Sequence, residues 1–123
     1  MRCPCGSGRQ LDGCCGALHA GRRPALTAEE LMRSRYTAFV LGDESWLRRS
    51  WHPSTRLRRI HVSGDDEWLG LTIVSARGGP LDDEGVVHFV AEVRRGDAVT
   101  RLEERSRFTR HDGAWVYLDG TVA

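Results

Sequence analysis

The sequence predicts an α+β fold in which N-terminal helices pack on one face of an antiparallel sheet. Helical periodicity with capping signals covers residues 27–53, and runs rich in β-forming residues, separated by glycine-containing turns, follow from residue 68 onward. In addition, all four cysteines of the 123-residue chain lie within its first fifteen residues. We therefore expect a small metal-binding knuckle over residues 1–20 and an α+β domain over residues 24–123.

The four cysteines have the spacing of a tetrahedral metal site. Cys3 and Cys5 supply two thiolates from one turn, and after eight residues Cys14 and Cys15 supply two more. Adjacent cysteines can both be ligands only where the backbone bends sharply, and that freedom is expected from Gly6, Gly8, Gly13 and Gly16. Four thiolates leave no position for water, so a structural zinc ion is expected, although thiolate sites also take iron.

Other uses of these thiols also fit the spacing. Four cysteines allow two disulfides, and Cys14-Cys15 could be a reactive thiol pair. No apolar targeting stretch follows Met1, which argues for a reducing cytoplasmic location and therefore against disulfides. His19 could replace one thiolate, but an exposed histidine is the simpler interpretation.

The helical part follows a predicted linker over residues 17–26. A capping box at Thr27-Ala28-Glu29-Glu30 starts a helix that should run to about Leu41 and stop at Gly42. Its apolar positions share one face and are Ala28, Leu31, Met32, Tyr36 and Phe39. Asp43 can cap a second helix that ends before Pro53.

Four strands are predicted after the helices. Turns are expected at Gly78-Gly79-Pro80, Arg95-Gly96-Asp97 and His111-Asp112-Gly113. The strands between and around these turns are Trp68–Ala76, Val86–Arg95, Ala98–Arg110 and Ala114–Asp119.

Alternation along the third strand predicts a carboxylate on the face that meets the helices. Leu102, Glu104, Ser106 and Phe108 share that face, and the apolar ends of the set mark it as the inner one. The neighbouring strand turns Phe89 to the same side. A carboxylate on such a face is costly unless it has a partner.

Two interpretations of Glu104 follow. In the first, Glu104 is a general base or ligand anchor in a small apolar pocket that is completed by Arg35, Tyr36, Phe89, Ser106 and His52. In the second, Glu104 forms a structural ion pair with Arg35 or Arg56 that ties a helix to the sheet. The ion pair is preferred because structural pairs are a common source of perturbed carboxylates.

Charge is distributed unevenly along the chain. Residues 1–61 contain eleven arginines and five acidic residues, whereas residues 62–123 contain seven arginines and twelve acidic residues. A basic first half could bind nucleic acid or an acidic protein surface. We prefer the interpretation that the two halves fold against each other and cancel, because no basic stripe with interleaved aromatic residues is present.

The run CPCGSGRQLDGCCG over residues 3–16 resembles the SEC-C motif, the zinc-binding tail of the preprotein translocase motor SecA. The resemblance implies that Cys3, Cys5, Cys14 and Cys15 are the zinc ligands. Two features differ: Cys15 stands where the SecA tail has histidine, and Arg9-Gln10-Leu11-Asp12 replaces a stretch that is usually basic and aromatic.

The rest of the chain resembles the bacterial YchJ family. The residues that carry this likeness are Leu31–Tyr36, Trp51–Arg56, Phe89–Ala91, Glu104–Phe108 and Trp115–Gly120. The resemblance implies a nuclear-transport-factor-two-like (cystatin-like) body, in which a curved antiparallel sheet wraps around helices into an open cone. Such cones include enzymes such as ketosteroid isomerase and also non-catalytic binding modules, so the fold alone does not assign a function.

These expectations favour a zinc-binding cytoplasmic adaptor over an enzyme. By resemblance to the SecA tail, its knuckle would contact the ribosome, a secretion chaperone or a nascent chain. The alternative is an enzyme or small-molecule receptor with a pocket around Glu104 and Ser106. Nucleic-acid binding through the arginine-rich first half is a third interpretation. No stretch approaches the roughly 20 apolar residues of a membrane span.

Overall fold

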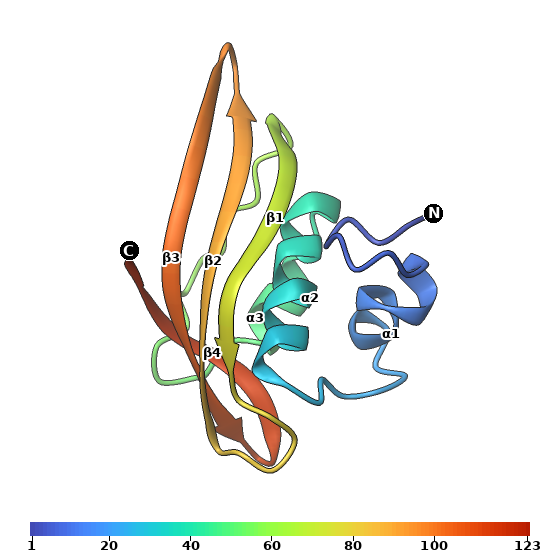
Figure 1. Cartoon of the computed structure of the whole chain (residues 1–123), viewed down its shortest axis with the longest axis vertical. Coiled ribbons are helices and arrows are strands. Elements are labelled where there is room, and N and C mark those ends of the chain that lie inside the picture. The colour runs from blue at the N-terminus through green and yellow to red at the C-terminus, as the bar shows by residue number, and fades with distance from the viewer.

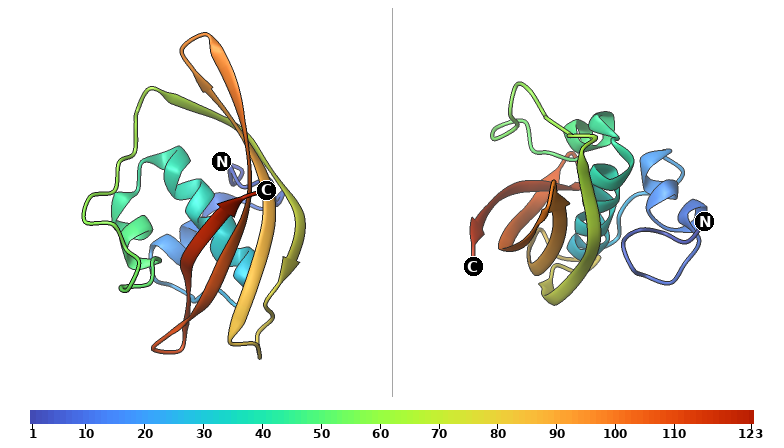
Figure 2. Two further views of the ribbon diagram at one scale, coloured as in Figure 1. Left: turned by 90° about the vertical axis from the view of Figure 1, so that its left-hand side faces the viewer. Right: turned by 90° about the horizontal axis from the view of Figure 1, so that it is seen from above.

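A computed structural model describes residues 1–123 and confirms the α+β architecture (Figure 1). The four strands form one antiparallel sheet in the order β1-β2-β3-β4, and the sheet curves around one face of the helices (Figure 2). The elements in chain order are the 3-10 turn η1 (Leu11–Gly13), α1 (Cys15–His19), α2 (Ala28–Leu41), α3 (Glu44–Arg49), β1 (Asp66–Arg77), β2 (Glu84–Arg95), β3 (Ala98–His111) and β4 (Ala114–Val122). No helix is long and apolar enough to cross a bilayer.

Local capping signals set the ends of α2 and α3. The Thr27 hydroxyl accepts a hydrogen bond from the Glu30 backbone N–H at 3.0 Å. The Glu30 carboxylate accepts one from the Leu26 backbone N–H at 2.9 Å, one residue before the position expected for a capping box. Gly42 ends α2 in the left-handed conformation, and the Asp43 side chain caps α3. The predicted bounds of α2 are therefore confirmed.

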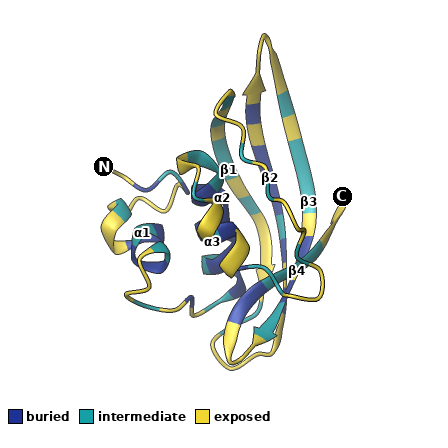
Figure 3. Ribbon diagram, turned by 180° about the vertical axis from the view of Figure 1, so that it is seen from behind, coloured by how far each residue is buried: buried dark blue, intermediate teal, exposed yellow.

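Helix α2 is the middle layer of the molecule, with the sheet on one side and the N-terminal segment on the other (Figure 2). Its apolar face packs on the sheet in a core formed by Leu31, Met32, Tyr36, Val87, Phe89, Ala91, Phe108 and Trp115. Much of α2 is buried (Figure 3). On the side opposite the sheet, Ser34 and Thr37 are fully inaccessible. Small polar residues suit this side because they have partners there: Ser34 Oγ donates to the Leu31 carbonyl and accepts from Trp46 Nε1, and Thr37 Oγ1 lies 3.6 Å from Cys3 Sγ.

The prediction of a linker over residues 17–26 is wrong for its first part. Cys15–His19 forms α1, and Leu18 and Ala25 join the main core. The His19 side chain is only 10% exposed, and its Nε2 lies 2.7 Å from the Ser34 backbone carbonyl. The expectation of an exposed histidine is therefore wrong, because α1 packs against α2 and turns the ring inward.

The expectation that the two oppositely charged halves pair with each other is also wrong. Each of the six arginine–carboxylate pairs joins residues of the same half, such as Arg33 with Glu29 and Arg107 with Asp119. The strand pairs lie side by side on the sheet, so acidic residues of the second half find arginines one strand away. The arginines of the first half therefore form no ion pairs with acidic residues of the sheet.

Candidate metal centre and binding pocket

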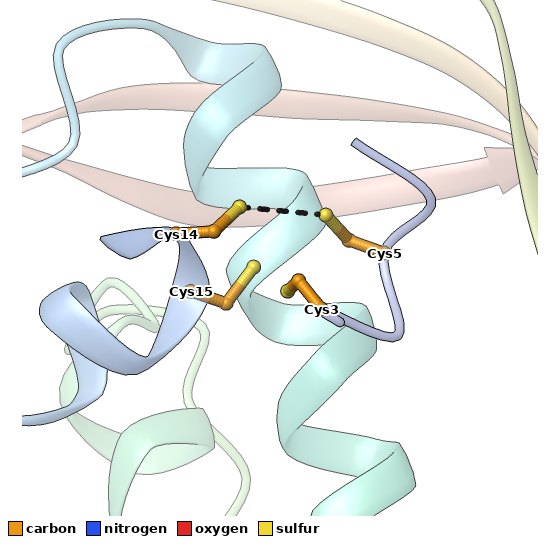
Figure 4. A group of neighbouring side chains, drawn as sticks. All are labelled: Cys3, Cys5, Cys14 and Cys15. Atoms are coloured by element: carbon orange, nitrogen blue, oxygen red, sulfur yellow. Dashed lines mark hydrogen bonds between the residues drawn. The ribbon is translucent and has the colours of Figure 1, made fainter. Parts of the chain in front are cut away.

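The four cysteine side chains converge on one point beside α2 (Figure 4). Their sulfur atoms all lie within 4.8 Å of one another, and Cys5 Sγ is 3.7 Å from Cys14 Sγ. Tetrahedral zinc with Zn–S bonds of about 2.3 Å places its sulfurs about 3.8 Å apart, whereas a disulfide needs about 2.05 Å. All four cysteines are buried. The residues present therefore fit a metal ion bound by four sulfurs.

Neighbouring groups hold the cysteine cluster in place. Ser7 Oγ lies 3.1 Å from Cys14 Sγ, and Thr37 Oγ1 of α2 lies 3.6 Å from Cys3 Sγ. The Arg33 guanidinium of α2 donates to the Cys5 backbone carbonyl at 2.6 Å. Two of these three contacts come from α2, so the cluster and the helix are positioned together.

The four thiols strongly influence the pKa values of Cys5, Cys14 and Cys15. A hydrogen bond with Cys15 lowers the pKa of Cys5 to about 4. That same hydrogen bond raises the pKa of Cys15, and burial raises the pKa of Cys14. Four buried thiols this close cannot all ionise unless a positive ion compensates them. The donor set is that of a thiophilic divalent metal.

Three of the four knuckle glycines have an identifiable structural reason. Gly6 and Gly8 adopt left-handed φ angles of 82° and 85°. A Cβ atom on Gly16 would lie 2.7 Å from the Leu11 carbonyl oxygen, which is too close. Gly13 has neither property, so the expectation that it supplies needed freedom is wrong.

The Gly16→Ala substitution is expected to weaken metal binding because α1 must move away from Leu11. Overpacking of this kind costs about 1–3 kcal/mol, which corresponds to about 5- to 150-fold in metal affinity. Gly13→Ala is the matched control, since a Cβ there meets nothing within 4 Å. Competition titration with a chromophoric chelator measures both variants; equal affinities would contradict the packing explanation.

A second candidate site lies between α2 and the inner face of the sheet. It is a cavity of about 310 Å³, and all five residues predicted for a ligand pocket line it: Arg35, Tyr36, Phe89, Glu104 and Ser106. Sequence reasoning missed Trp51 and Tyr117, which also line the cavity. These two residues are brought to the cavity by a contact between distant parts of the chain. The loop after α3 pairs in parallel with β4 through a Trp51–Tyr117 bridge, and no local sequence pattern predicts that pairing.

Glu104 has no ion-pair partner, so the preferred interpretation of a structural pair is wrong. Arg35 instead donates from Nη1 to the Leu47 carbonyl at 2.9 Å and to Ser50 Oγ at 2.7 Å. Arg56 donates to the Trp51 carbonyl at 3.0 Å. The carboxyl group therefore borders the cavity without a compensating charge, and burial raises its pKa.

Arg35 is a buried cation held by aromatic rings. Its guanidinium carbon lies 5.2 Å from the centre of the Trp51 ring and 4.6 Å from that of Tyr117. The residue is only 5% exposed. Burial lowers the pKa of Arg35 to about 10, so the group remains charged at neutral pH.

His52 does not line the cavity, which corrects its place among the candidate site residues. Its Nδ1 lies 2.7 Å from Ser54 Oγ and accepts a hydrogen bond from the Ser54 backbone N–H. Its ring packs edge-on against His111. The backbone N–H of His52 donates to the Tyr117 carbonyl at 2.8 Å, and His52 is absent from the cavity lining.

The Glu104→Gln substitution is expected to stabilise the chain at neutral pH. The pKa of Glu104 is higher in the folded state than in the unfolded state. Protonated Glu104 therefore favours folding below pH 4.5, and the protein loses this stabilisation as the pH rises through the folded-state pKa. The gain at pH 7 should be under about 1 kcal/mol, since the group is partly solvated. Urea unfolding at pH 4 and pH 7 measures it. Glu92→Gln, exposed on the outer face, is the control; equal pH dependence for both variants would contradict an uncompensated Glu104.

Known proteins match this chain over nearly its whole length. Residues 27–120 match the family model described as the middle NTF2-like domain of YchJ. A UPF0225 protein of Streptomyces coelicolor is 50% identical over 119 residues, which cover 96% of this chain and 93% of that protein. A UPF0225 protein of Chromobacterium violaceum is 47% identical over 126 residues, covering 98% and 93%.

Two solved structures share the fold over nearly the whole chain. The solution structure of a SEC-C motif-containing protein from Rhodopseudomonas palustris has a TM-score of 0.89 and 33% identity, and the match covers 100% of this chain and 99% of that one. The crystal structure of a SEC-C motif-containing protein from Psychrobacter arcticus has a TM-score of 0.79 and 25% identity, covering 98% and 82%. Both the cone and the N-terminal segment are thus shared with proteins described by that motif.

Proposed function

The chain belongs to the YchJ (UPF0225) family, and from that premise we propose that it is a cytoplasmic protein that binds a small organic molecule in the cavity between α2 and the sheet. The single observation that carries the proposal is the cavity of about 310 Å³, lined mainly by apolar residues and bordered by the unpaired Glu104 and Arg35. Binding is preferred to catalysis because Glu104 has no hydrogen-bonded partner that would orient it as a general base.

In this proposal a zinc ion on Cys3, Cys5, Cys14 and Cys15 has a structural role. Four thiolates close the coordination sphere, so the ion contributes free energy of folding and no reactive position. Iron would satisfy the same donor set. The contacts of Arg33 and Thr37 with the cluster support a role in fixing the N-terminal segment on α2, the helix that also lines the cavity.

The test is a binding measurement on the metal-loaded full chain. Three probes share a phenyl group on a short hydrocarbon chain and differ in the charge of the polar end: 3-phenylpropionate, 3-phenylpropanamide and 3-phenylpropylamine. Each is titrated into the protein, and binding is followed by the NMR shifts of the backbone N–H groups. Leu102→Trp fills the cavity from β3, and Val99→Trp places the same ring on the outer face of that strand. Binding of any probe that Leu102→Trp abolishes and Val99→Trp retains supports the proposal. Failure of all three probes, or equal binding to both variants, contradicts it.

An adaptor role through the knuckle is the second candidate. The observation that favours it is the exposure of residues 6–10 around the buried cysteines, in a segment that resembles the SEC-C motif. The proposed partners are the ribosome, a secretion chaperone or a nascent chain. Cosedimentation of the chain with purified ribosomes, compared with Arg9→Ala, tests the first of these. Loss of binding in the variant supports contact through this loop, and the absence of cosedimentation by the unaltered chain opposes it.

A further inference from the structure

Arg35 is a buried charge that forms no ion pair within the protein. None of the six arginine–carboxylate pairs includes Arg35, and its two acceptors, the Leu47 carbonyl and Ser50 Oγ, are uncharged and both bound by Nη1. Buried arginines are almost always paired, because an isolated charge is costly away from water. The residue lines the cavity, so a bound molecule has access to the charge.

The polar groups around Arg35 also need an acceptor. Trp51 Nε1 is a buried donor with no hydrogen-bond partner, and the ring of Trp51 packs on the guanidinium. The hydroxyl of the buried Ser106 lines the same cavity and makes no hydrogen bond within the protein. Two carboxyl groups also line the cavity: Asp66 pairs with Arg95, and Glu104 makes no ion pair or hydrogen bond with Arg35. The cavity therefore offers donors, the Arg35 guanidinium and Trp51 Nε1, that no acidic side chain of the protein pairs with.

We propose that the ligand of this pocket is an amphiphilic organic acid whose carboxylate is received by Arg35 while its hydrocarbon or aromatic body lies against the inner face of the sheet. This inference rests on the proposed ligand-binding function. The apolar part of the lining includes Tyr36, Trp68, Phe89, Ala91 and Leu102, which suits such a body. A guanidinium recognises a carboxylate through parallel hydrogen bonds.

A second arginine at the cavity does not compete for this role. Arg95 lies at the rim, its side chain is 51% exposed, and it already pairs with Asp66 at 3.2 Å. Water screens a charge in that position. Arg35 lies in a less polar environment, where attraction to an anion is stronger. The anion is therefore assigned to the buried arginine.

Binding of the three phenylpropyl probes shows which ligand charge the pocket prefers. It is followed by the indole N–H signals of the chain in NMR spectra. Trp46 Nε1 donates to Ser34 Oγ and Trp115 Nε1 donates to the Leu26 carbonyl, so these two signals are internal controls for Trp51. We expect 3-phenylpropionate to bind about ten-fold or more tightly than the amide and to move the Trp51 signal most, because hydrogen bonds to charged groups are the stronger ones. Equal or tighter binding of the amide or the amine would overturn the anion assignment while leaving the pocket function intact. Failure of all three probes would oppose both.

Two arginine variants test which residue binds the carboxylate of the ligand. Arg35→Gln is expected to weaken 3-phenylpropionate binding by about 10- to 100-fold and amide binding far less, whereas Arg95→Gln should change neither by more than about two-fold. The chemical-shift dispersion of the backbone N–H signals checks that each variant is folded. If Arg35→Gln does not fold, the ranking of the three probes on the unaltered chain decides the matter. Unchanged carboxylate affinity in a folded Arg35→Gln protein would overturn the assignment.

Discussion

Replacing Cys5 with serine is expected to release the metal ion and to lower the free energy of unfolding of the whole chain by several kcal/mol. Metal binding and folding are coupled in such short segments, since residues 1–14 have almost no apolar core apart from the cysteines themselves. Cys5 is completely buried, and its backbone carbonyl accepts the hydrogen bond of Arg33. Loss of the ion should therefore loosen the knuckle from α2 and expose Thr37.

Metal content and thermal unfolding of the full chain measure this effect together. A loss of about 3 kcal/mol would lower Tm by about 10 °C in a chain of this size. Ser7→Ala is the matched control, because it removes one hydroxyl beside Cys14 and leaves all four thiolates. We expect it to keep one metal ion per chain. A Cys5→Ser protein that retains stoichiometric metal and an unchanged Tm would contradict the coupling.

Replacing Leu18 with alanine is expected to destabilise the sheet and helices, although Leu18 lies in the short N-terminal helix. Its side chain is 2% exposed and belongs to the main core with Leu31 and Trp115. Removal of a fully buried leucine costs about 2–5 kcal/mol. The effect should therefore appear in the global unfolding transition and not only in local signals from the knuckle.

Urea unfolding followed by tryptophan fluorescence measures the Leu18→Ala effect. Leu26→Ala is the control, since Leu26 is 55% exposed and should change stability by no more than about 0.5 kcal/mol. If Leu18→Ala behaved like Leu26→Ala, the N-terminal segment would be an independent appendage and not part of the core described above.

Features set by neighbouring residues could be predicted from the sequence. The caps at Thr27 and Asp43 and the glycine at position 42 fix helix ends through bonds that span a few residues. Turn residues and period-two alternation predicted all four strands, and the structure lengthens them by one to three residues at most ends because paired neighbours continue the ladders. The inner face of β3 follows from the same alternation, which brought Glu104 and Ser106 into the predicted pocket set.

Features set by distant contacts could not be predicted. Arg35 and Glu104 both border the cavity, and the expected pair failed because Arg35 finds its partners on Leu47 and Ser50, twelve and fifteen residues along the chain. The buried polar side of α2 has no apolar pattern, so nothing in its sequence indicated a second covered face. The position of Trp51 likewise depends on its pairing with Tyr117 across the fold.

A crystal structure of the metal-loaded full chain with 3-phenylpropionate tests the central claim most directly. We predict that the phenyl group occupies the cavity between α2 and the sheet and that the carboxylate lies within hydrogen-bonding distance of the Arg35 guanidinium. A cavity that holds only water at saturating probe, or one closed by Trp68 and Leu102 side chains, would contradict the claim that this pocket is a ligand-binding site.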